Sequence, residues 1–435
     1  MNTTMQAMLA AALCLAGSAS AQTGNWTTTR TLEGPFGTAS IPDPPLVAMN
    51  ANGRALLAWN ASGVVRFAER DKGGAWLPRA NVPGGGTGAG PVAIAIGRSG
   101  AAAIAYTTAA SRYTPSKLMV SLQSADGVFG IAAEPAPGVV AGDLKLAISC
   151  DGSVTLLWSG GSALWTSTLA GTGRTSGACD GQPGSGPWSA PLQLADAHVG
   201  ASLPDMVAND DGAALAVWQE GATGNPSAIL AAYRPAGGAW QAAQRASAPT
   251  ARPTWSPKPA IDAAGHAAIA YLDGQGVVVV ARDAGAGWGA PSLVSGSQAA
   301  YYPGLAMSAS GDRLVAWLTL DAQGSAGAVW ARVAHAGGDW SASKRLSGIG
   351  EDAYLPNAAF ADDGSVAVVG WTDNAANTAR ASVYTTGTWT RRPLGTGYWS
   401  GGVRVAAGAG AAVSGWAMPN LANPNSAKLV ARAWE

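Results

Sequence analysis

The sequence predicts an all-β protein made of eight tandem repeats. Two aromatic positions recur along the chain, glycine-containing turns separate short apolar runs, and successive repeats start 46 to 60 residues apart. The 59 Gly and 26 Pro residues alternate with apolar runs, as turns do in a β-protein. No useful stretch has the 3.6-residue periodicity of an amphipathic helix, so strands are the expected elements throughout.

The repeat is defined by two aromatic positions. The first is an aromatic residue six residues after a glycine, or seven in the seventh copy: Gly53/Trp59, Gly100/Tyr106, Gly152/Trp158, Gly212/Trp218, Gly265/Tyr271, Gly311/Trp317, Gly364/Trp371 and Gly410/Trp416. The second alternates with it: Trp26, Trp76, Phe129, Trp188, Trp240, Trp288, Trp340 and Trp389. Thirteen of the 18 tryptophans occupy these sixteen positions, which indicates one structural unit per copy.

Each copy is expected to form four short strands. Asn-Gly, Asp-Gly, Ser-Gly and Ala-Gly pairs before the second strand favour two-residue hairpins. Four strands at this repeat length are typical of β-propeller blades, and the alanine-rich strands suit sheets that pack face to face in a wedge. In the fourth copy the expected strands are 206–209, 213–218, 229–234 and 240–246.

Eight repeat glycines predict eight four-stranded blades in one domain, residues 22–435. The eighth copy ends after its third strand, and Trp26–Leu32 has the pattern of a fourth strand. We therefore expect the N-terminal strand to complete the last blade and to remove an open sheet edge. Seven blades with an additional hairpin is the alternative count.

The first 21 residues resemble a secretory signal peptide. Met8–Gly17 is apolar but too short to span a bilayer, and Ala19-Ser20-Ala21 forms an A-x-A cleavage site. No other segment has the length of a membrane-spanning helix, so no membrane insertion is expected. The mature protein is predicted to be secreted or periplasmic.

Two cysteines remain after removal of the signal peptide, Cys150 and Cys179. In an oxidising compartment an isolated pair most often forms a disulfide. Both lie in connections at the same end of the third blade, the second inside a Gly-rich insertion. We predict that they are bonded and that the bond tethers this insertion.

The charge of the chain excludes two classes of partner. The 26 Lys and Arg residues balance the 26 Asp and Glu residues, and only 12% of residues are charged. Nucleic acids and anionic lipid surfaces both select a basic surface. Neither partner is expected.

The turn before the second aromatic position carries a family resemblance. In the first copy it reads Asp71-Lys72-Gly73-Gly74-Ala75-Trp76, similar to the D-x-G-x-x-W Asp-box turns of sialidase-like (BNR-type) propellers. The resemblance implies a propeller fold, and the boxes of that family are structural. The first arginine of its catalytic triad would precede the inner strand of blade 1, but Pro44–Met49 contains none. We therefore assign no catalytic residue from this resemblance.

No cluster predicts a metal or cofactor site. Asn209–Gly212 and Ala361–Gly364 contain acidic residues, but they occupy hairpin turns and lack the further carboxylates of a calcium site. His198, His266 and His335 fall at three different repeat positions, whereas zinc needs converging ligands. We expect neither a metal nor a cofactor.

A candidate ligand site lies in the segments between blades. Five copies carry proline eight residues before the repeat glycine: Pro45, Pro204, Pro257, Pro303 and Pro356. Two residues earlier, three consecutive copies carry an aromatic ring, and Tyr302, Tyr398 and Trp399 lie in the same segments. Such rings either pack the linkers or bind a ligand. The candidate residues are Trp255, Tyr301, Tyr354, Arg252, Lys258, Glu351 and Asp352.

The leading hypothesis is a non-enzymatic module that binds a glycan or an extracytoplasmic protein through this face. Aromatic rings pair with the C–H faces of sugars, and this pairing needs no net charge. The alternative is a carbohydrate-active hydrolase or lyase with its site on the same face, since two converging carboxylates would suffice for hydrolysis. Its candidate carboxylates are Glu220, Asp273, Glu351, Asp352 and Asp373.

Overall fold

The computed structural model describes residues 24–37, 43–85, 90, 92–110, 116–124, 126–196, 200–221, 227–249, 254–296, 298–321, 323–324, 326–397, 401–419 and 426–435. These residues form 31 strands and no helix, which confirms the all-β prediction. In the same ranges there is accordingly no helix long and apolar enough to cross a membrane. The predicted signal peptide, residues 1–21, lies outside them.

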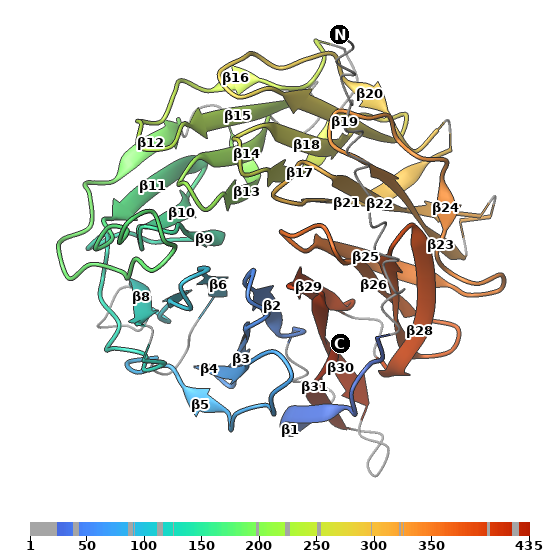
Figure 1. Ribbon diagram of the computed structural model, residues 1–435, viewed down its shortest axis with the longest axis horizontal. Helices are drawn as coiled ribbons and strands as arrows, with labels where there is room; N and C mark the ends of the chain where they lie inside the picture. The colour runs from blue at the N-terminus through green and yellow to red at the C-terminus, as the bar shows by residue number, and fades with distance from the viewer. Residues whose placement is uncertain are drawn as a thin grey trace, which may run out of the picture.

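The strands form eight antiparallel sheets that stand as blades around a central axis (Figure 1). Blade 1 contains β2 (Leu46–Met49), β3 (Ala55–Ala61), β4 (Val64–Arg70) and β5 (Ala80–Asn81), and blade 2 contains β6 (Val92–Ile96), β7 (Ala102–Thr107) and β8 (Leu118–Gln123). Blade 3 contains β9 (Leu144–Ile148), β10 (Val154–Gly160), β11 (Ala163–Leu169) and β12 (Leu192–Ala195), and blade 4 contains β13 (Ser202–Ala208), β14 (Ala214–Glu220), β15 (Ala228–Arg234) and β16 (Gln244–Arg245).

Blade 5 contains β17 (Trp255–Ile261), β18 (Ala267–Leu272), β19 (Val277–Arg282) and β20 (Ser292–Leu293), and blade 6 contains β21 (Ala300–Met307), β22 (Arg313–Leu320), β23 (Gly327–Ala334) and β24 (Lys344–Arg345). Blade 7 contains β25 (Ala353–Phe360), β26 (Ala367–Asp373), β27 (Thr378–Thr385) and β28 (Thr388–Thr396), and blade 8 contains β29 (Arg404–Gly408), β30 (Ala411–Pro419), β31 (Ser426–Trp434) and β1 (Arg30–Gly37). The eight-bladed propeller is thus confirmed, and the seven-blade alternative is wrong.

Blade 2 differs from the expected four strands. Its described part has three, and the segment after β8 makes only two isolated bridges, Gln123 to Phe129 and Val120 to Ala133. Between the bridges the Ser121 hydroxyl donates to the Gly130 carbonyl at 2.7 Å. The Ser121 side chain therefore occupies the Gly130 carbonyl, which a backbone N–H of β8 would use if the fourth strand were continuous.

In blades 1 to 6 the repeat glycine lies in a turn that is one residue longer than predicted. All eight copies have φ between 69° and 92°, a conformation that favours glycine. In blade 1 the Gly53 N–H donates to the Asn50 carbonyl at 2.9 Å, and the Asn50 N–H donates to the Arg54 carbonyl at 3.0 Å. This is a three-residue hairpin loop, a type I turn followed by a left-handed residue. The two-residue hairpin was therefore the wrong turn type in these copies, although the glycine was correctly placed. In blade 8 it was right, because Gly408 pairs with Ala411 and the turn consists of Ala409 and Gly410, with φ of 46° and 69°.

The first aromatic position joins neighbouring blades. All eight rings are at most 3% exposed. Trp158 of blade 3 packs in one cluster with Ala105 and Val120 of blade 2, and Trp416 of blade 8 packs with Val368 of blade 7. The other six rings likewise share a cluster with the blade before their own. Loss of such a buried ring costs about 3–5 kcal/mol, so this position holds the ring of blades together.

The second aromatic position is less buried, and in blades 4, 5 and 6 its ring stacks against an arginine. Arg234 lies 5.3 Å from the ring centroid of Trp240, and Arg313 lies 5.1 Å from that of Trp340. A guanidinium over an aromatic face gives a cation–π attraction of about 0.5–1 kcal/mol when the pair is exposed. This position therefore stabilises individual blades more weakly than the first.

The N-terminal strand β1 is the outer strand of blade 8. It pairs antiparallel with β31, from Arg30 opposite Ala431 to Gly37 opposite Ser426. The strand lies later than the expected Trp26–Leu32, because Trp26 makes only an isolated bridge to Trp434. The same offset of four residues separates Trp240 from the first residue of β16.

Ion pairs connect this last blade to the first. Glu33 of β1 is 7% exposed, and its carboxylate lies 2.6 Å from Arg66 and 3.1 Å from Arg79 of blade 1. Arg70 of blade 1 pairs with Glu435 at 2.5 Å. The joint between the two ends of the ring is thus formed by charged groups as well as by Trp59.

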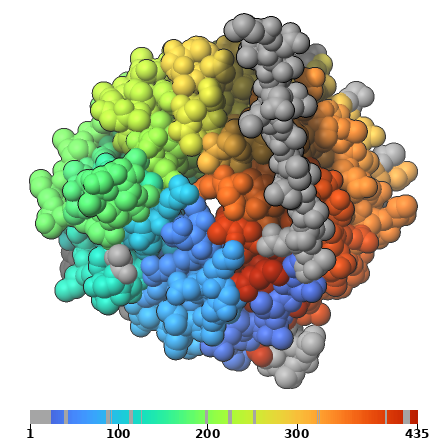
Figure 2. All heavy atoms as spheres, viewed as in Figure 1, coloured from blue at the N-terminus to red at the C-terminus, as the bar shows by residue number. Residues whose placement is uncertain are grey.

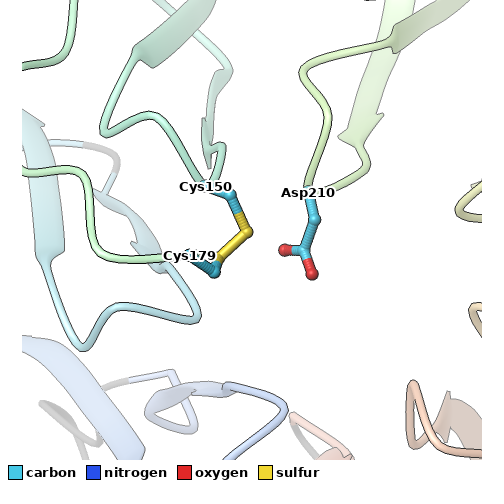
Figure 3. Close-up of side chains that lie close together, drawn as sticks. All are labelled: Cys150, Cys179 and Asp210. Carbon is cyan, nitrogen blue, oxygen red and sulfur yellow. A yellow bond between two sulfur atoms is a disulfide. The ribbon is translucent and has the colours of Figure 1, made fainter. Parts of the chain in front are cut away.

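Cys150 and Cys179 form a disulfide, as predicted. Cys150 lies in the turn after β9, and Cys179 in the insertion between β11 and β12 (Figure 3). The insertion continues to the turn of blade 4, where Arg174 donates to the Asp210 carbonyl at 2.7 Å and pairs with Asp211 at 2.7 Å. The bond therefore holds a segment that links blades 3 and 4.

Deletion of residues 24–37 should expose the edge of β31 and leave Arg66 and Arg79 without Glu33. We expect Tm to fall by roughly 10 °C or more, or the protein to aggregate. Differential scanning calorimetry measures the change in Tm. Glu33→Gln, which keeps the strand and removes only the carboxylate, should lower Tm by less. A deletion variant that melts like the wild type would show that β1 does not contribute to closure.

Replacing both cysteines by serine should destabilise the fold by about 2–4 kcal/mol, because the reduced unfolded chain gains freedom. Urea unfolding measures the change. Intact-mass analysis of the wild type under non-reducing conditions provides the control, and two alkylatable thiols there would contradict the bond.

Candidate functional site

The two ends of the propeller differ in the segments that they carry. The linkers into the inner strands and the loops between second and third strands lie at one end, which we call the entry face. The hairpin turns with the repeat glycines lie at the other, the turn face. The inner strands run from the entry face to the turn face, as β13 does from Ser202 to the turn at Asn209.

Four successive inner strands begin with the same backbone irregularity. Leu203, Ser256, Tyr302 and Leu355 have φ between 49° and 56°, and each precedes one of the repeat prolines. Each lies in a β-bulge, as between Trp255 and Lys258, which pair with Leu272 and Ala270. Because Leu272 and Ala270 point to the same side of β18, the bulge also keeps Trp255 and Lys258 on one side. The left-handed conformation is strained in non-glycine residues, so the fold holds these four positions against a local cost.

The residue after each bulge belongs to a ring of equivalent positions. In every blade one inner-strand residue pairs with the residue just before the buried aromatic, as Asp205 pairs with Val217 before Trp218. We call these eight residues the axial ring. They are Leu46, Ala93, Lys145, Asp205, Lys258, Gly304, Asn357 and Arg404.

A cavity of about 480 Å³ opens on the axis beside this ring. Figure 2 shows an opening at the centre of the disc. The cavity is lined by the last six axial-ring residues, by Ser256, Tyr302 and Leu355 of the bulges, and by neighbouring residues of the inner strands. Its volume lies within the range of small-molecule sites. We call it the axial cavity.

Asp205 is held between two lysines in this cavity. Its carboxylate oxygens lie 3.2 Å from Lys145 of blade 3 and 3.2 Å from Lys258 of blade 5. Burial acts to raise the pKa of Asp205, but the charges and hydrogen bonds of the two ammonium groups outweigh it and hold the pKa below its ordinary value. One carboxylate thus connects three blades and fixes two cations at the cavity wall.

Arg404 of β29 and Asn357 of β25 form the opposite part of the lining. Burial lowers the pKa of the Arg404 guanidinium, while the nearby Asp43 carboxylate acts in the opposite direction. The Asn357 side-chain oxygen accepts the Val405 N–H at 2.9 Å, so its amide NH₂ is directed elsewhere. This side of the cavity presents hydrogen-bond donors.

A second axial cavity, of about 400 Å³, follows toward the turn face and is lined by apolar side chains together with Asp362. Two residues beyond the axial ring, all blades but one place alanine, and blade 4 has Val207. At the turn face Arg98 of blade 2 pairs with Asp210 of blade 4 at 3.1 Å. The polar groups of the axial cavity are therefore followed by a wall of methyl groups.

The predicted aromatic residues divide between two places. Trp255 and Tyr301 line a small cavity of about 120 Å³ between blades 5 and 6 on the entry face. Trp255 is half-buried against a core cluster, and Tyr301 is 37% exposed. Tyr354 contacts Tyr302 instead, with ring centroids 5.3 Å apart and hydroxyls 2.7 Å apart. Of these rings only Tyr302 lines the axial cavity.

The predicted polar residues have separate positions. Lys258 lines the axial cavity, and Arg252 lies outside the described residues, as do Tyr398 and Trp399. Glu351 is paired with Arg391 at 2.7 Å and with Arg380 at 3.1 Å. Asp352 accepts the Gly327 N–H at 2.9 Å. Both acids are therefore engaged in holding the loops of blades 6 and 7.

The candidate carboxylates of the enzymatic alternative are not equivalent. Asp373 shares Arg380 with Glu351, at 2.9 Å from the guanidinium. Asp273 accepts the Gln275 N–H at 2.9 Å within its own loop. Burial raises the pKa of Glu220, at the end of β14. This burial favours the protonated form of Glu220.

One group in the described residues brings metal-ligating atoms together, Cys150, Cys179 and Asp210 (Figure 3). The two sulfur atoms are bonded to each other and are not thiolate ligands. His266 pairs with Asp262 at 2.8 Å and His335 with Asp312 at 3.3 Å, each in its own blade. His198 lies outside the described residues.

Sequence reasoning missed Lys145, Asp205, Asn357 and Arg404. They are isolated polar residues in otherwise apolar inner strands, and the strands are about one repeat apart. They could have been found by comparing one position in all eight copies, seven residues before the repeat glycine, or six in the last copy.

No family model matches the chain, and no curated protein matches it. Solved structures do. A puromycin hydrolase shares 14% identity with a TM-score of 0.50, over 89% of this chain and 61% of that one. The polysaccharide lyase Uly1 shares 12% identity with a TM-score of 0.49, over 93% and 99%. An inactive variant of virginiamycin B lyase from Staphylococcus aureus, with quinupristin, shares 12% identity with a TM-score of 0.44, over 79% and 94%. At these identities the likeness shows the propeller fold alone, and the sialidase-like turn sequence remains a resemblance.

Asp205→Asn should leave Lys145 and Lys258 facing each other without a counter-charge. We expect a loss of about 1–3 kcal/mol at pH 7. Because the folded pKa of Asp205 is lowered, its stabilisation is present above the unfolded pKa of about 3.9 and is lost as the pH falls through the folded value. The gap in Tm between wild type and variant should therefore shrink below about pH 4. A gap that is the same at pH 7 and pH 3 would contradict the role of the ionised carboxylate.

Proposed function

We propose that this chain is an exported, non-enzymatic binding module that takes a glycan on the entry face of its propeller. The observation that carries the proposal is the axial cavity, a concave site with several polar groups and rings beside it. Binding sites combine such a shape with a few placed polar side chains. Export is proposed from residues 1–21, and the disulfide is consistent with an oxidising compartment.

Carbohydrate is favoured over an extracytoplasmic protein by the form of the site. A protein partner would need an interface of roughly 800 Å² on this chain, whereas the recognisable polar groups are gathered in a cavity. The exposed rings Tyr301 and Tyr302 stand at the entry face, 37% and 40% exposed. An aromatic face stacks on the C–H face of a sugar while the cavity walls offer hydrogen-bond donors.

The enzymatic alternative, a carbohydrate-active hydrolase or lyase, rests on Glu220. A carboxyl group whose pKa is raised can donate a proton to a leaving group. Such an enzyme also needs a second group within reach, and Glu351 and Asp373 are held by arginines. Binding without turnover is therefore the simpler reading of the described residues.

The test is a glycan array probed with the wild type and with the triple variant Trp255→Ala/Tyr301→Ala/Tyr354→Ala. We expect at least a ten-fold loss of affinity, about 1.4 kcal/mol. Tyr301→Ala alone should lose part of it without unfolding, because that ring is 37% exposed.

The matched control is Trp240→Ala/Trp340→Ala, which removes two half-buried rings of the turn face and should bind as the wild type does. Undiminished binding by the triple variant would show that the three rings pack the linkers and do not contact the ligand. Release of shorter products from a bound saccharide would favour the enzymatic alternative. Loss of that release in Glu220→Gln would then identify Glu220 as the general acid.

A further inference from the structure

The axial cavity carries an excess of positive charge in a chain that is neutral overall. Among its described lining residues Lys145, Lys258 and Arg404 are cations, and Asp205 is an anion. Asp43 adds a second carboxylate close enough to act on Arg404. These groups together leave one positive charge without a counter-charge, while the whole chain has 26 basic and 26 acidic residues.

The cations have donor capacity to spare. Each ammonium group has three N–H donors. Lys145 contacts one carboxylate oxygen of Asp205, and Lys258 contacts the other. The Arg404 guanidinium has five donors and makes no hydrogen bond to another described residue. The Asn357 NH₂ adds donors on the same side. The walls of the cavity therefore offer many donors, and the Asp205 carboxylate is already shared by two lysines.

The arrangement is built to hold these charges in place. Asp205 keeps two lysines from turning outward, and the bulges of blades 5 to 7 bring Ser256, Tyr302 and Leu355 to the rim. The described lining of the second cavity contains no cationic side chain, and its one polar side chain is the Asp362 carboxyl, which would repel an entering anion when it is ionised. A polar group that enters is thus stopped at the level of the cations, where partial burial strengthens its attraction.

We infer that the axial cavity binds a singly charged oxyanion, a carboxylate or a sulfate ester, carried by the bound saccharide. The inference rests on the proposed function and narrows its ligand to acidic glycans. One anionic group would restore charge balance in the cavity, and a planar carboxylate can accept two N–H bonds from a guanidinium. Lys145, Lys258, Arg404 and Asn357 are the residues that would hold it.

The test compares three matched probes by isothermal titration: an oligosaccharide that contains a uronate, its carboxyl-reduced neutral counterpart, and a sulfated counterpart. We expect the neutral probe to bind at least ten-fold more weakly than the better of the two acidic ones. Arg404→Gln should remove that difference, and raising the salt concentration should reduce it.

Arg392→Gln is the matched control, since Arg392 is exposed on β28, the outer strand of blade 7. Equal binding of acidic and neutral probes, or unchanged binding by Arg404→Gln, would overturn the inference and leave the proposed function standing. If no saccharide binds, the proposed function fails. Titration with inorganic sulfate then tests separately whether the axial cavity binds an anion. Sulfate binding that depends on Arg404 would support the cationic site, and no binding would overturn it.

Discussion

The packing of one buried aromatic ring against the preceding blade is the interaction on which this propeller depends. It occurs eight times, with rings at most 3% exposed, and joins each sheet to the one before it. Because Trp59 of blade 1 packs against blade 8, the series closes on itself. In the described part of the chain, each blade therefore covers an apolar face of its neighbour.

This packing also determines which side chains meet at the propeller axis. Once the blades are fixed at their flanks, the inner strands converge and equivalent residues of all blades meet at one level. A single side chain such as Asp205 then contacts residues from repeats on both sides of its own. The site therefore arises from the symmetry of the scaffold together with departures from that symmetry, since the axial ring has Leu46 and Ala93 in blades 1 and 2 but charged residues in blades 3, 4, 5 and 8.

Much of the fold could be predicted from the sequence because its signals are local and repeated. The glycine and aromatic of each repeat lie within one hairpin, so their spacing indicates blades, and Trp26 showed which strand was missing from the last one. The disulfide followed from the connections that hold Cys150 and Cys179. The turn type of blades 1 to 6 was missed although side chains mark it. The Asn50 side-chain oxygen accepts the N–H groups of Asn52 and Arg54, and that of Asn209 accepts the N–H of Ala213. The bulges were missed in the same way, although their prolines were noticed. The axial cavity needed contacts between strands a whole repeat apart, and these exist only after the ring has closed.

The pairing of β1 with β31 has a consequence for biosynthesis. Arg30 finds its partner at Ala431, so about 400 residues must be made between the two strands. At a synthesis rate of 5–20 residues per second, that interval is roughly 20 to 80 s. During it β1 has no partner strand, so its backbone N–H and C=O groups are hydrogen-bonded by water. The seven other blades can form as the chain emerges, whereas the last one cannot be completed until both ends are present.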